Sequence, residues 1–271
     1  MLRNDGDRLR RVLVSSPGSA YFDPTTHAAN NIPELADRTQ TGRQHARMVA
    51  TLTAAGAEVI DVPGLEGHPN SVFTRDVALC TPNGHIVLRM GLAARRGEER
   101  WMSAALEELG EPCIGAIEDP GTVEGGDVIL AGTVAFVGIS GRTNGEGARQ
   151  LADMLEGMGY EVRTIMVAEQ HLHLGGAMSV IAPKRLLCCD TGVPADVLEG
   201  FDVVTVQGRG PSTGNVICVG PNEVIANIAE NAEAIRILER NGVIVHSVDL
   251  SEFRKGAGGP TCLILPVERG E

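Results

Sequence analysis

Apolar and polar positions along the chain repeat in a fixed order of short strand, turn, short strand, amphipathic helix and strand. The clearest copy of this order runs from residue 127 to residue 167. Residues 127–130 and 134–137 predict two strands around an AGT turn, and residues 161–167 predict the closing strand. Between them a helix is expected from about Gly145 to Met158, with one apolar face formed by Ala148, Leu151, Ala152 and Leu155.

The same order recurs in four other parts of the chain. Three copies begin at DVALCTPNGHIVLRM, AMSVIAPKRLLCCD and NVICVGPNEVIAN. The fourth is split, because the strand CLILPV near the C-terminus needs RVLVSSP, a helix across Gln40–Ala55 and EVIDVP from near the N-terminus. A unit split in this way brings the chain ends together and closes a ring of repeats. The pattern therefore predicts an α/β protein built as a closed ring of five pseudo-symmetric ββαβ units.

An open doubly wound α/β sheet is the alternative fold. Strand pairs joined by tight turns fit its plain βαβ alternation poorly, so the ring is favoured. No linker or low-complexity stretch interrupts the pattern, and we expect residues 1–271 to form a single domain.

Composition narrows the classes of partner. The 271 residues are 43% hydrophobic and carry a formal net charge of −12 without any basic run, which argues against nucleic acid or an anionic membrane as partner. No signal peptide is evident, and no apolar stretch approaches the roughly 20 residues of a membrane span. We therefore expect a soluble cytoplasmic protein whose six cysteines are reduced.

Residues suited to chemistry gather where the first strand of each unit is expected to begin. These segments are NSVFTRD (70–76), VEGGD (123–127), HLHLGGAMS (171–179), GNV (214–216) and GGPTC (258–262). In a ring they would converge at one end of the central axis. Carboxylates bind the N–H groups of a planar cation, a thiolate attacks it, and an imidazole moves the proton. The set therefore suits an amide-like cationic substrate.

Cys262 has two interpretations. It opens the apolar, strand-like run CLIL (262–265), where a cysteine is ordinarily a small core residue. The glycine-rich lead-in GAGGPT, however, allows the backbone to approach a substrate closely and favours a presented nucleophile. The other five cysteines are expected in the core, at positions 80, 113, 188, 189 and 218.

The HLH sequence raises a metal site as an alternative, because His171 and His173 share one face of an extended segment. No HxxxH or CxxC motif accompanies them, so we predict no metal. The segment GRGPSTG (208–214) does not match a phosphate-binding loop, and no organic cofactor is expected either.

The motifs together resemble a known superfamily. FTRD (73–76), EGGD (124–127), RT (142–143), HL (173–174) and GGPTC (258–262) occur in the order seen in the guanidine-modifying enzymes, the amidinotransferase or pentein superfamily. This superfamily includes dimethylarginine dimethylaminohydrolase, arginine deiminase and arginine amidinotransferase. The resemblance spans nearly the whole chain and implies a five-bladed α/β propeller, in agreement with the repeats.

The resemblance also implies catalytic roles. Cys262 matches the nucleophile and His173 the general acid/base, while Asp76 and Glu124 match the pair that holds the guanidinium group. The reaction implied is cleavage of a C–N bond through a covalent cysteine intermediate, with a ureido product such as citrulline.

Three residues match those that bind the amino-acid end of the substrate. Arg95 and Arg142 match the residues that bind its carboxylate, with Arg96 or Arg89 as alternatives to Arg95. Asn70 matches a position that contacts the same end of the substrate. The implied partner is therefore a small guanidino amino acid.

The choice of substrate stays open at this point. The chain has the compact length of dimethylargininases, and Gly175 stands where arginine deiminases place an aspartate, which could leave room for N-methyl groups. Arg75 stands where dimethylargininases usually carry an acidic residue, and Asn70 resembles arginine deiminases and dihydrolases. We expect hydrolysis of arginine or Nω-methylated arginine, with deiminase, dihydrolase (ornithine-forming) and amidinotransferase activities as alternatives.

A binding protein is the alternative from another class. A ribosome-binding translation factor uses the same ring without catalysis, but it would lack the cysteine, histidine and carboxylates and would not be this acidic. The oligomeric state stays open, with a homodimer as one expectation.

Overall fold

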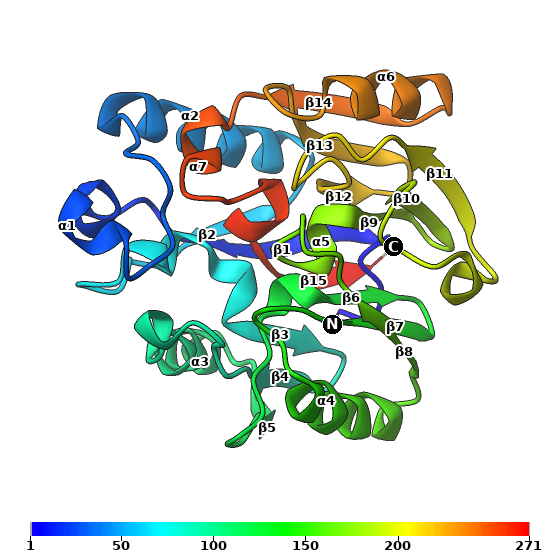
Figure 1. The fold of residues 1–271 in the computed structure, drawn as a ribbon, viewed down its shortest axis with the longest axis horizontal. Helices are drawn as coiled ribbons and strands as arrows, with labels where there is room; N and C mark the ends of the chain where they lie inside the picture. Colours follow the sequence, from blue (N-terminus) through cyan, green and yellow to red (C-terminus); the bar gives the residue numbers. More distant parts are fainter. Residues whose placement is uncertain (1, 271) are drawn as a thin grey trace.

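The computed structural model describes residues 2–270 as a ring of five three-stranded sheets (Figure 1). In every sheet an antiparallel pair of strands is extended by a third strand parallel to the middle one. In the order edge, middle, edge the strands are β15 (Leu265–Gly270), β1 (Arg8–Val14), β2 (Glu58–Asp61); β3 (Ala78–Thr81), β4 (Gly84–Val87), β5 (Cys113–Ala116); β6 (Val128–Ala131), β7 (Val134–Ile139), β8 (Glu161–Met166); β9 (Met178–Ala182), β10 (Arg185–Cys189), β11 (Asp202–Val206); and β12 (Val216–Gly220), β13 (Glu223–Asn227), β14 (Ile244–Val248). The predicted ring of five ββαβ units is confirmed.

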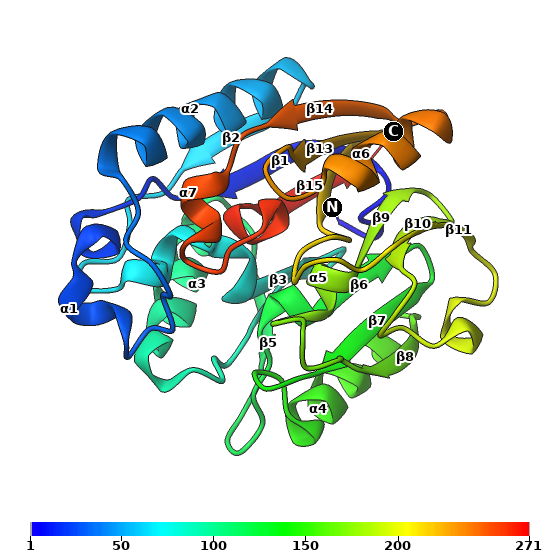
Figure 2. The ribbon, with the colours of Figure 1, turned by 45° about the horizontal axis from the view of Figure 1, so that its top comes forward.

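Helices connect the second and third strands of the sheets and lie on the outside of the ring (Figures 1 and 2). They are α2 (Arg38–Ala54), α3 (Glu98–Glu108), α4 (Gly145–Gly157) and α6 (Ala232–Arg240). Between β10 and β11 the connection is the short 3-10 helix η6 (Ala195–Leu198). In α4 the side chain of Asn144 accepts a hydrogen bond from the Gly147 amide, and Leu151 and Leu155 are buried. No helix among the described residues is long and apolar enough to cross a bilayer.

The split unit closes the ring as expected. Strand β1 pairs antiparallel with β15, with Leu13 opposite Leu265, and parallel with β2, with Val12 opposite Val59. Segments from the two ends of the chain therefore form one sheet.

The first strands of the units line the ring axis, where strands β3, β6, β9 and β12 are buried along their whole length. A short turn precedes each first strand and holds the motif residues. These turns are η3 (Thr74–Asp76), η5 (Gly125–Asp127), the one-turn helix α5 (Leu174–Ala177), the turn at 211–214 and η7 (Pro260–Leu263). Contacts of η3 with η5 and η7, and of η5 with α5, bring the turns together at one end of the axis.

The expected strand start at Cys262 is wrong. Cys262 lies in η7, and β15 begins only at Leu265. Pro260 fixes its own φ and lacks an N–H, which favours a turn at this point, and the Cys262 amide donates to the Gly259 carbonyl at 3.2 Å. The thiol is therefore presented by a turn instead of by an extended strand.

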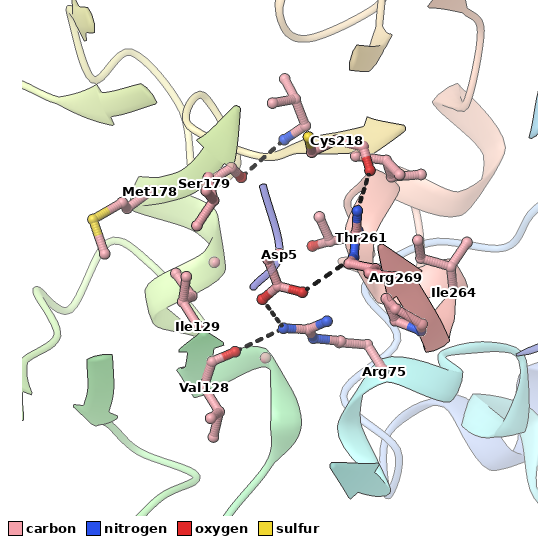
Figure 3. A pocket seen from close by; sticks show the side chains of 16 residues that line it. Asp5, Arg75, Val128, Ile129, Met178, Ser179, Cys218, Thr261, Ile264 and Arg269 are labelled. Atoms are coloured by element: carbon pink, nitrogen blue, oxygen red, sulfur yellow. Dashed lines mark hydrogen bonds and ion pairs between the residues drawn. The ribbon is translucent and has the colours of Figure 1, made fainter. Parts of the chain in front are cut away.

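The N-terminal segment fills the axis below the turns. Asp5 lies between two arginines in Figure 3, with Oδ2 at 3.2 Å from Nη2 of Arg75 and Oδ1 at 3.6 Å from Nε of Arg269. The Leu130 amide also donates to Asp5 Oδ2 at 3.1 Å. The cavity left here measures only about 40 Å³, so this part of the channel is nearly closed.

Candidate active site

The five turns enclose a cavity with two lobes that share Leu172, His173, Ala257 and Cys262. The first, called the carboxylate lobe, measures about 30 Å³ and is lined by Asn70, Asp76, Arg95, Glu124 and Arg142 together with the shared residues. The second, called the glycine lobe, measures about 220 Å³ and is lined by Gly126, Gly175, Gly176 and Gly259 among others. All seven residues that the sequence singled out therefore line one cavity, with the thiol and the imidazole where the lobes meet.

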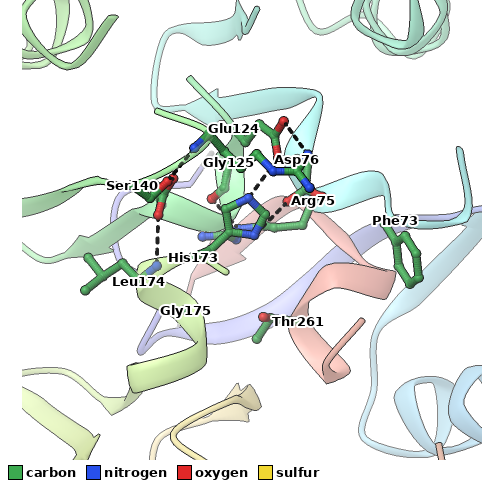
Figure 4. A network of polar contacts seen from close by, with 12 residues as sticks. Phe73, Arg75, Asp76, Glu124, Gly125, Ser140, His173, Leu174, Gly175 and Thr261 are labelled. Atoms are coloured by element: carbon green, nitrogen blue, oxygen red, sulfur yellow. Dashed lines mark hydrogen bonds and ion pairs between the residues drawn. The ribbon is translucent and has the colours of Figure 1, made fainter. Parts of the chain in front are cut away.

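His173 is held between two carboxylates (Figure 4). Its Nε2 lies 2.8 Å from Oε2 of Glu124, and its Nδ1 lies 3.9 Å from Oδ1 of Asp76. The rings of His171 and His173 do not share a site, because Nδ1 of His171 lies 2.8 Å from the Pro211 carbonyl oxygen.

These charges determine the protonation of the imidazole. Burial alone would lower the pKa of His173, but the negative charges of Asp76, Asp127 and Glu124 outweigh it and raise this pKa to about 9. Burial would likewise raise the pKa of Glu124, but the hydrogen bond and charge of His173, with Arg95 and Arg142, lower it to about 2. At neutral pH the pair is therefore an imidazolium and a carboxylate.

Asp127 holds the backbone of the segment that carries His173. Its Oδ2 accepts hydrogen bonds from the hydroxyls of Ser140 and Thr143, both at 2.7 Å, and its Oδ1 accepts from the Leu174 amide at 2.9 Å. The carboxylate thus fixes the backbone directly after His173. Burial raises the pKa of Asp127 above its usual value.

Arg95 lies beneath Asp76. Its Nη1 donates to Asp76 Oδ2 at 2.6 Å, and its Nε and Nη2 donate to Glu98 Oε2 at 2.9 and 2.8 Å. Nη2 also donates to the backbone carbonyls of Asn70 and Phe73. Most of the donors of Arg95 are therefore occupied by the protein, and its guanidinium fixes the position of the Asp76 carboxylate.

Arg142 is the other predicted cation of the site. Its side chain is 10% exposed, and its Nη1 lies 3.5 Å from Glu124 Oε1. Arg89 and Arg96, the alternatives to Arg95, line a separate hollow on the surface. Among these four arginines, the structure therefore brings only Arg95 and Arg142 into the cavity.

Two buried oxygens of the carboxylate lobe lack hydrogen-bond donors within the described part of the chain: Oδ1 of Asp76 and Oδ1 of Asn70. The amide nitrogen of Asn70 is occupied, because it donates to the Asn30 carbonyl at 2.9 Å. Buried acceptors are nearly always paired in proteins. This lobe therefore offers two acceptor oxygens to a ligand that has N–H donors.

Cys262 is a thiol in the free protein at neutral pH. Burial and the nearby charge of Asp76 raise the pKa of Cys262 to about 12. The residue is nevertheless only partly buried, and it borders both lobes. It therefore needs an added positive charge nearby to become a thiolate.

A divalent metal ion fits the same residues less well. Asp76, Glu124 and His173 each offer one ligand atom, and these atoms lie within 4.8 Å of one another. However, His173 Nε2 already lies 2.8 Å from Glu124 Oε2, so a metal ion would have to displace this hydrogen-bonded proton and break the contact. The arrangement suits an organic cation with N–H donors better.

Sequence reasoning missed two contributors. Glu98 is fully buried and holds Arg95, although its segment RRGEER reads as an ordinary charged helix start. Asn215 is 2% exposed and contacts the segments of both Cys262 and His173, and its only signal was its place in the axis-facing GNV.

Comparisons with known proteins agree with this geometry. An N(G),N(G)-dimethylarginine dimethylaminohydrolase of Streptomyces coelicolor is 30% identical over 260 residues, covering 94% of this chain and 95% of that protein. An arginine deiminase of Listeria innocua is 28% identical, covering 76% of this chain and 63% of that protein. The solved structure of a dimethylarginine dimethylaminohydrolase from Pseudomonas aeruginosa, a cysteine-to-serine mutant complexed with citrulline, matches with a TM-score of 0.83 and 28% identity, covering 95% of this chain and 99% of that chain.

The profile of one family spans nearly the entire chain. It is described as N,N dimethylarginine dimethylhydrolase, eukaryotic, and it matches residues 17–269. The chain therefore belongs to the N,N dimethylarginine dimethylhydrolase family, whose members are hydrolases acting on amidine C–N bonds.

Proposed function

We propose that this protein hydrolyses Nω-methylated arginine to citrulline and a methylamine. The observation that carries the choice of a methylated substrate is the glycine lobe. It adjoins Cys262 and His173, it measures about 220 Å³, and Gly126, Gly175 and Gly259 contribute no side chains to its walls. Methyl groups on the departing nitrogen find room there, and no carboxylate stands at Gly175 to bind an unsubstituted N–H group.

The substrate would bind through its two charged ends. Asp76 Oδ1, which accepts no hydrogen bond from the described residues, and the carboxylate of Glu124 accept hydrogen bonds from the guanidinium. Arg142 binds the substrate carboxylate. Asn70 offers its free Oδ1 to the substrate amino group. Arg95, given above as a predicted carboxylate ligand, has its main contacts with Asp76 and Glu98 and acts chiefly by orienting Asp76.

The bound cation also activates the nucleophile. A positive charge beside Cys262 favours the thiolate over the thiol, so the thiol loses its proton to solvent only when substrate is present. The thiolate then bonds to the guanidinium carbon. This requirement protects the free enzyme from unwanted alkylation.

Two proton transfers complete the reaction. The C–N bond to the methylated nitrogen breaks, and the electron pair leaves with the amine, which takes a proton from the His173 imidazolium. An S-alkyl thiouronium remains on Cys262. A water molecule then gives one proton to the neutral imidazole and attacks the same carbon. The C–S bond breaks with its electron pair returning to Cys262 as the thiolate, the second proton of the water passes to solvent, and citrulline is released.

Product analysis tests this function directly. We expect citrulline and dimethylamine from asymmetric dimethylarginine, and turnover of L-arginine that is slower by at least about tenfold, which corresponds to about 1.4 kcal/mol of discrimination. Mass spectrometry of both products after separate incubations measures this. Faster formation of citrulline or ornithine from L-arginine would instead place the protein with deiminases or dihydrolases.

A side chain at position 175 should change this preference. A Cβ on Gly175 would lie 3.1 Å from the Gly126 carbonyl oxygen and 3.8 Å from Thr261 Oγ1, within the glycine lobe, and no positive φ opposes it. We expect Gly175→Ala to lower kcat/KM for asymmetric dimethylarginine at least about fivefold more than for L-arginine. Gly145→Ala, where an added Cβ meets open space, is the matched control and should leave the ratio unchanged. An unchanged ratio in Gly175→Ala would show that the glycine lobe does not determine the preference for a methylated substrate.

A further inference from the structure

One buried side chain joins the segment that carries the nucleophile to the segment that carries the acid/base. Asn215 lies between the turn at 211–214 and the first residue of β12, and it has no role in the chemistry described above. Its side-chain Nδ2 donates to the Gly175 carbonyl at 2.8 Å and to Thr261 Oγ1 at 2.7 Å. Its Oδ1 accepts from the Thr261 amide at 2.9 Å.

These partners also fix the orientation of the amide. The Gly175 carbonyl only accepts and the Thr261 amide only donates, so an exchange of Oδ1 and Nδ2 would break both contacts. Both amide hydrogens of Asn215 are occupied, and the residue is 2% exposed.

The hydrogen-bond partners of Asn215 are neighbours in sequence of the nucleophile and of the acid/base. Thr261 directly precedes Cys262, and Gly175 follows His173 by two residues. Figure 4 shows Gly175 and Thr261 on the two segments near His173. Asp127 fixes the same histidine segment from its other side through the Leu174 amide. One amide therefore spans the gap between two units whose side chains must act on one carbon atom.

The nucleophile segment is packed to match this amide. A Cβ on Gly259 would lie 2.8 Å from Cγ of Asn215 and 3.0 Å from both Nδ2 and Oδ1, closer than real Cβ contacts allow. The second glycine of GGPTC is thus required because the backbone lies against the Asn215 amide.

We propose that Asn215 is a positioning residue that sets the Cys262 turn relative to the His173 turn. It touches no reacting atom and acts through Thr261 and Gly175. Loss of its amide should leave substrate binding in the carboxylate lobe nearly intact, because none of Asp76, Glu124 and Arg142 bonds to it, while the reacting groups lose their alignment. The inference deepens the proposed function and rests on it for the turnover measurements below.

The first experiment compares Asn215→Ala with a matched buried asparagine. Asn227 is fully buried and its Oδ1 accepts hydrogen bonds from the Ala229 and Leu250 amides, so Asn227→Ala also removes hydrogen bonds between segments, but none to the turns of the site. With asymmetric dimethylarginine we expect Asn215→Ala to lower kcat at least about 50-fold while KM changes less than about threefold. Asn227→Ala should keep kcat within about threefold even where its Tm falls as far as that of Asn215→Ala.

Thr261→Val tests the path of the effect. It removes the hydroxyl that accepts from Asn215 but keeps the Thr261 amide contact. We expect a smaller loss of kcat than in Asn215→Ala, and we expect the double variant to lose much less than the product of the two single losses, because both changes break one connection. Multiplicative losses would contradict the proposal.

Alkylation of Cys262 by iodoacetamide gives a second readout that needs no substrate. Burial holds the pKa of this thiol near 12, so a loosened turn should expose it and lower its pKa toward its ordinary value. Peptide mass spectrometry at pH 8 should show alkylation at least about tenfold faster in Asn215→Ala than in the wild type, and unchanged in Asn227→Ala. If the wild type turned over no methylated arginine, the function would fail and alkylation would still decide the role of Asn215. Equal alkylation, or a kcat within about twofold of wild type, would overturn that role.

Discussion

Cys262→Ser is expected to lower turnover of asymmetric dimethylarginine by at least about 10⁴-fold while the protein stays folded. Serine has nearly the size of cysteine, so the partly buried η7 turn should accept it. Its hydroxyl ionises far less readily than a thiol, however, and the bound cation cannot make it an effective nucleophile. Steady-state kinetics measures the loss, and calorimetric titration should still detect substrate binding, because the carboxylate lobe is unchanged.

Cys113→Ser is the matched control. The expected core position of Cys113 is wrong, because it is exposed at the start of β5. It lines neither lobe of the cavity, and its replacement should leave kcat/KM unchanged. Residual activity above about 1% in Cys262→Ser, after exclusion of contaminating wild type, would show that the reaction does not pass through a covalent adduct on this residue.

Glu124→Gln should have the second largest effect, a loss of about 10³-fold in kcat/KM near pH 8.5. The change removes a charged hydrogen bond to the guanidinium, worth about 1.5–3 kcal/mol, and it also removes the anion paired with the His173 imidazole. The pKa of His173 should then fall from its value of about 9. Because the departing amine needs the protonated imidazole, activity falls as pH rises through this pKa.

The pH profile separates the two contributions. In the substrate complex, where Cys262 is already a thiolate, kcat should decline on the basic side as His173 loses its proton. In Glu124→Gln this decline should move to lower pH, so the deficit in kcat grows across the interval between the two declines. Glu146→Gln alters an exposed carboxylate on α4 and should change neither rate nor profile. A basic limb that stays in place would mean that Glu124 does not control the protonation of His173.

Much of the architecture could be predicted because it follows from local patterns. Alternating apolar residues, tight turns and the split terminal unit were sufficient for the five-unit ring, and motif order was sufficient to bring Asp76, Glu124, His173 and Cys262 to one end of it. These features depend on spacing along the chain, which a sequence displays directly.

Other features depend on contacts between distant segments. CLIL has the composition of a strand, and the contact of Asn215 with the Thr261 amide, together with Pro260, holds Cys262 in a turn. Arg95 has the appearance of a surface charge, yet it is buried and donates to both Glu98 and Asp76. A sequence does not display the pairing of Arg95 with Asp76 or of Thr261 with Asn215, because the partners are 19 and 46 residues apart in the chain.

The ion pairs of Asp5 with Arg75 and Arg269 have a consequence for the order of events. They narrow the far end of the axis to a cavity of about 40 Å³, so within the described residues we expect ligands to enter and leave through the face that bears the motif turns. The amine must depart by the same route that admits the hydrolytic water, while the rest of the substrate stays attached to the enzyme. Release of the amine should therefore precede entry of the hydrolytic water, and a high concentration of free amine should slow hydrolysis of the covalent intermediate.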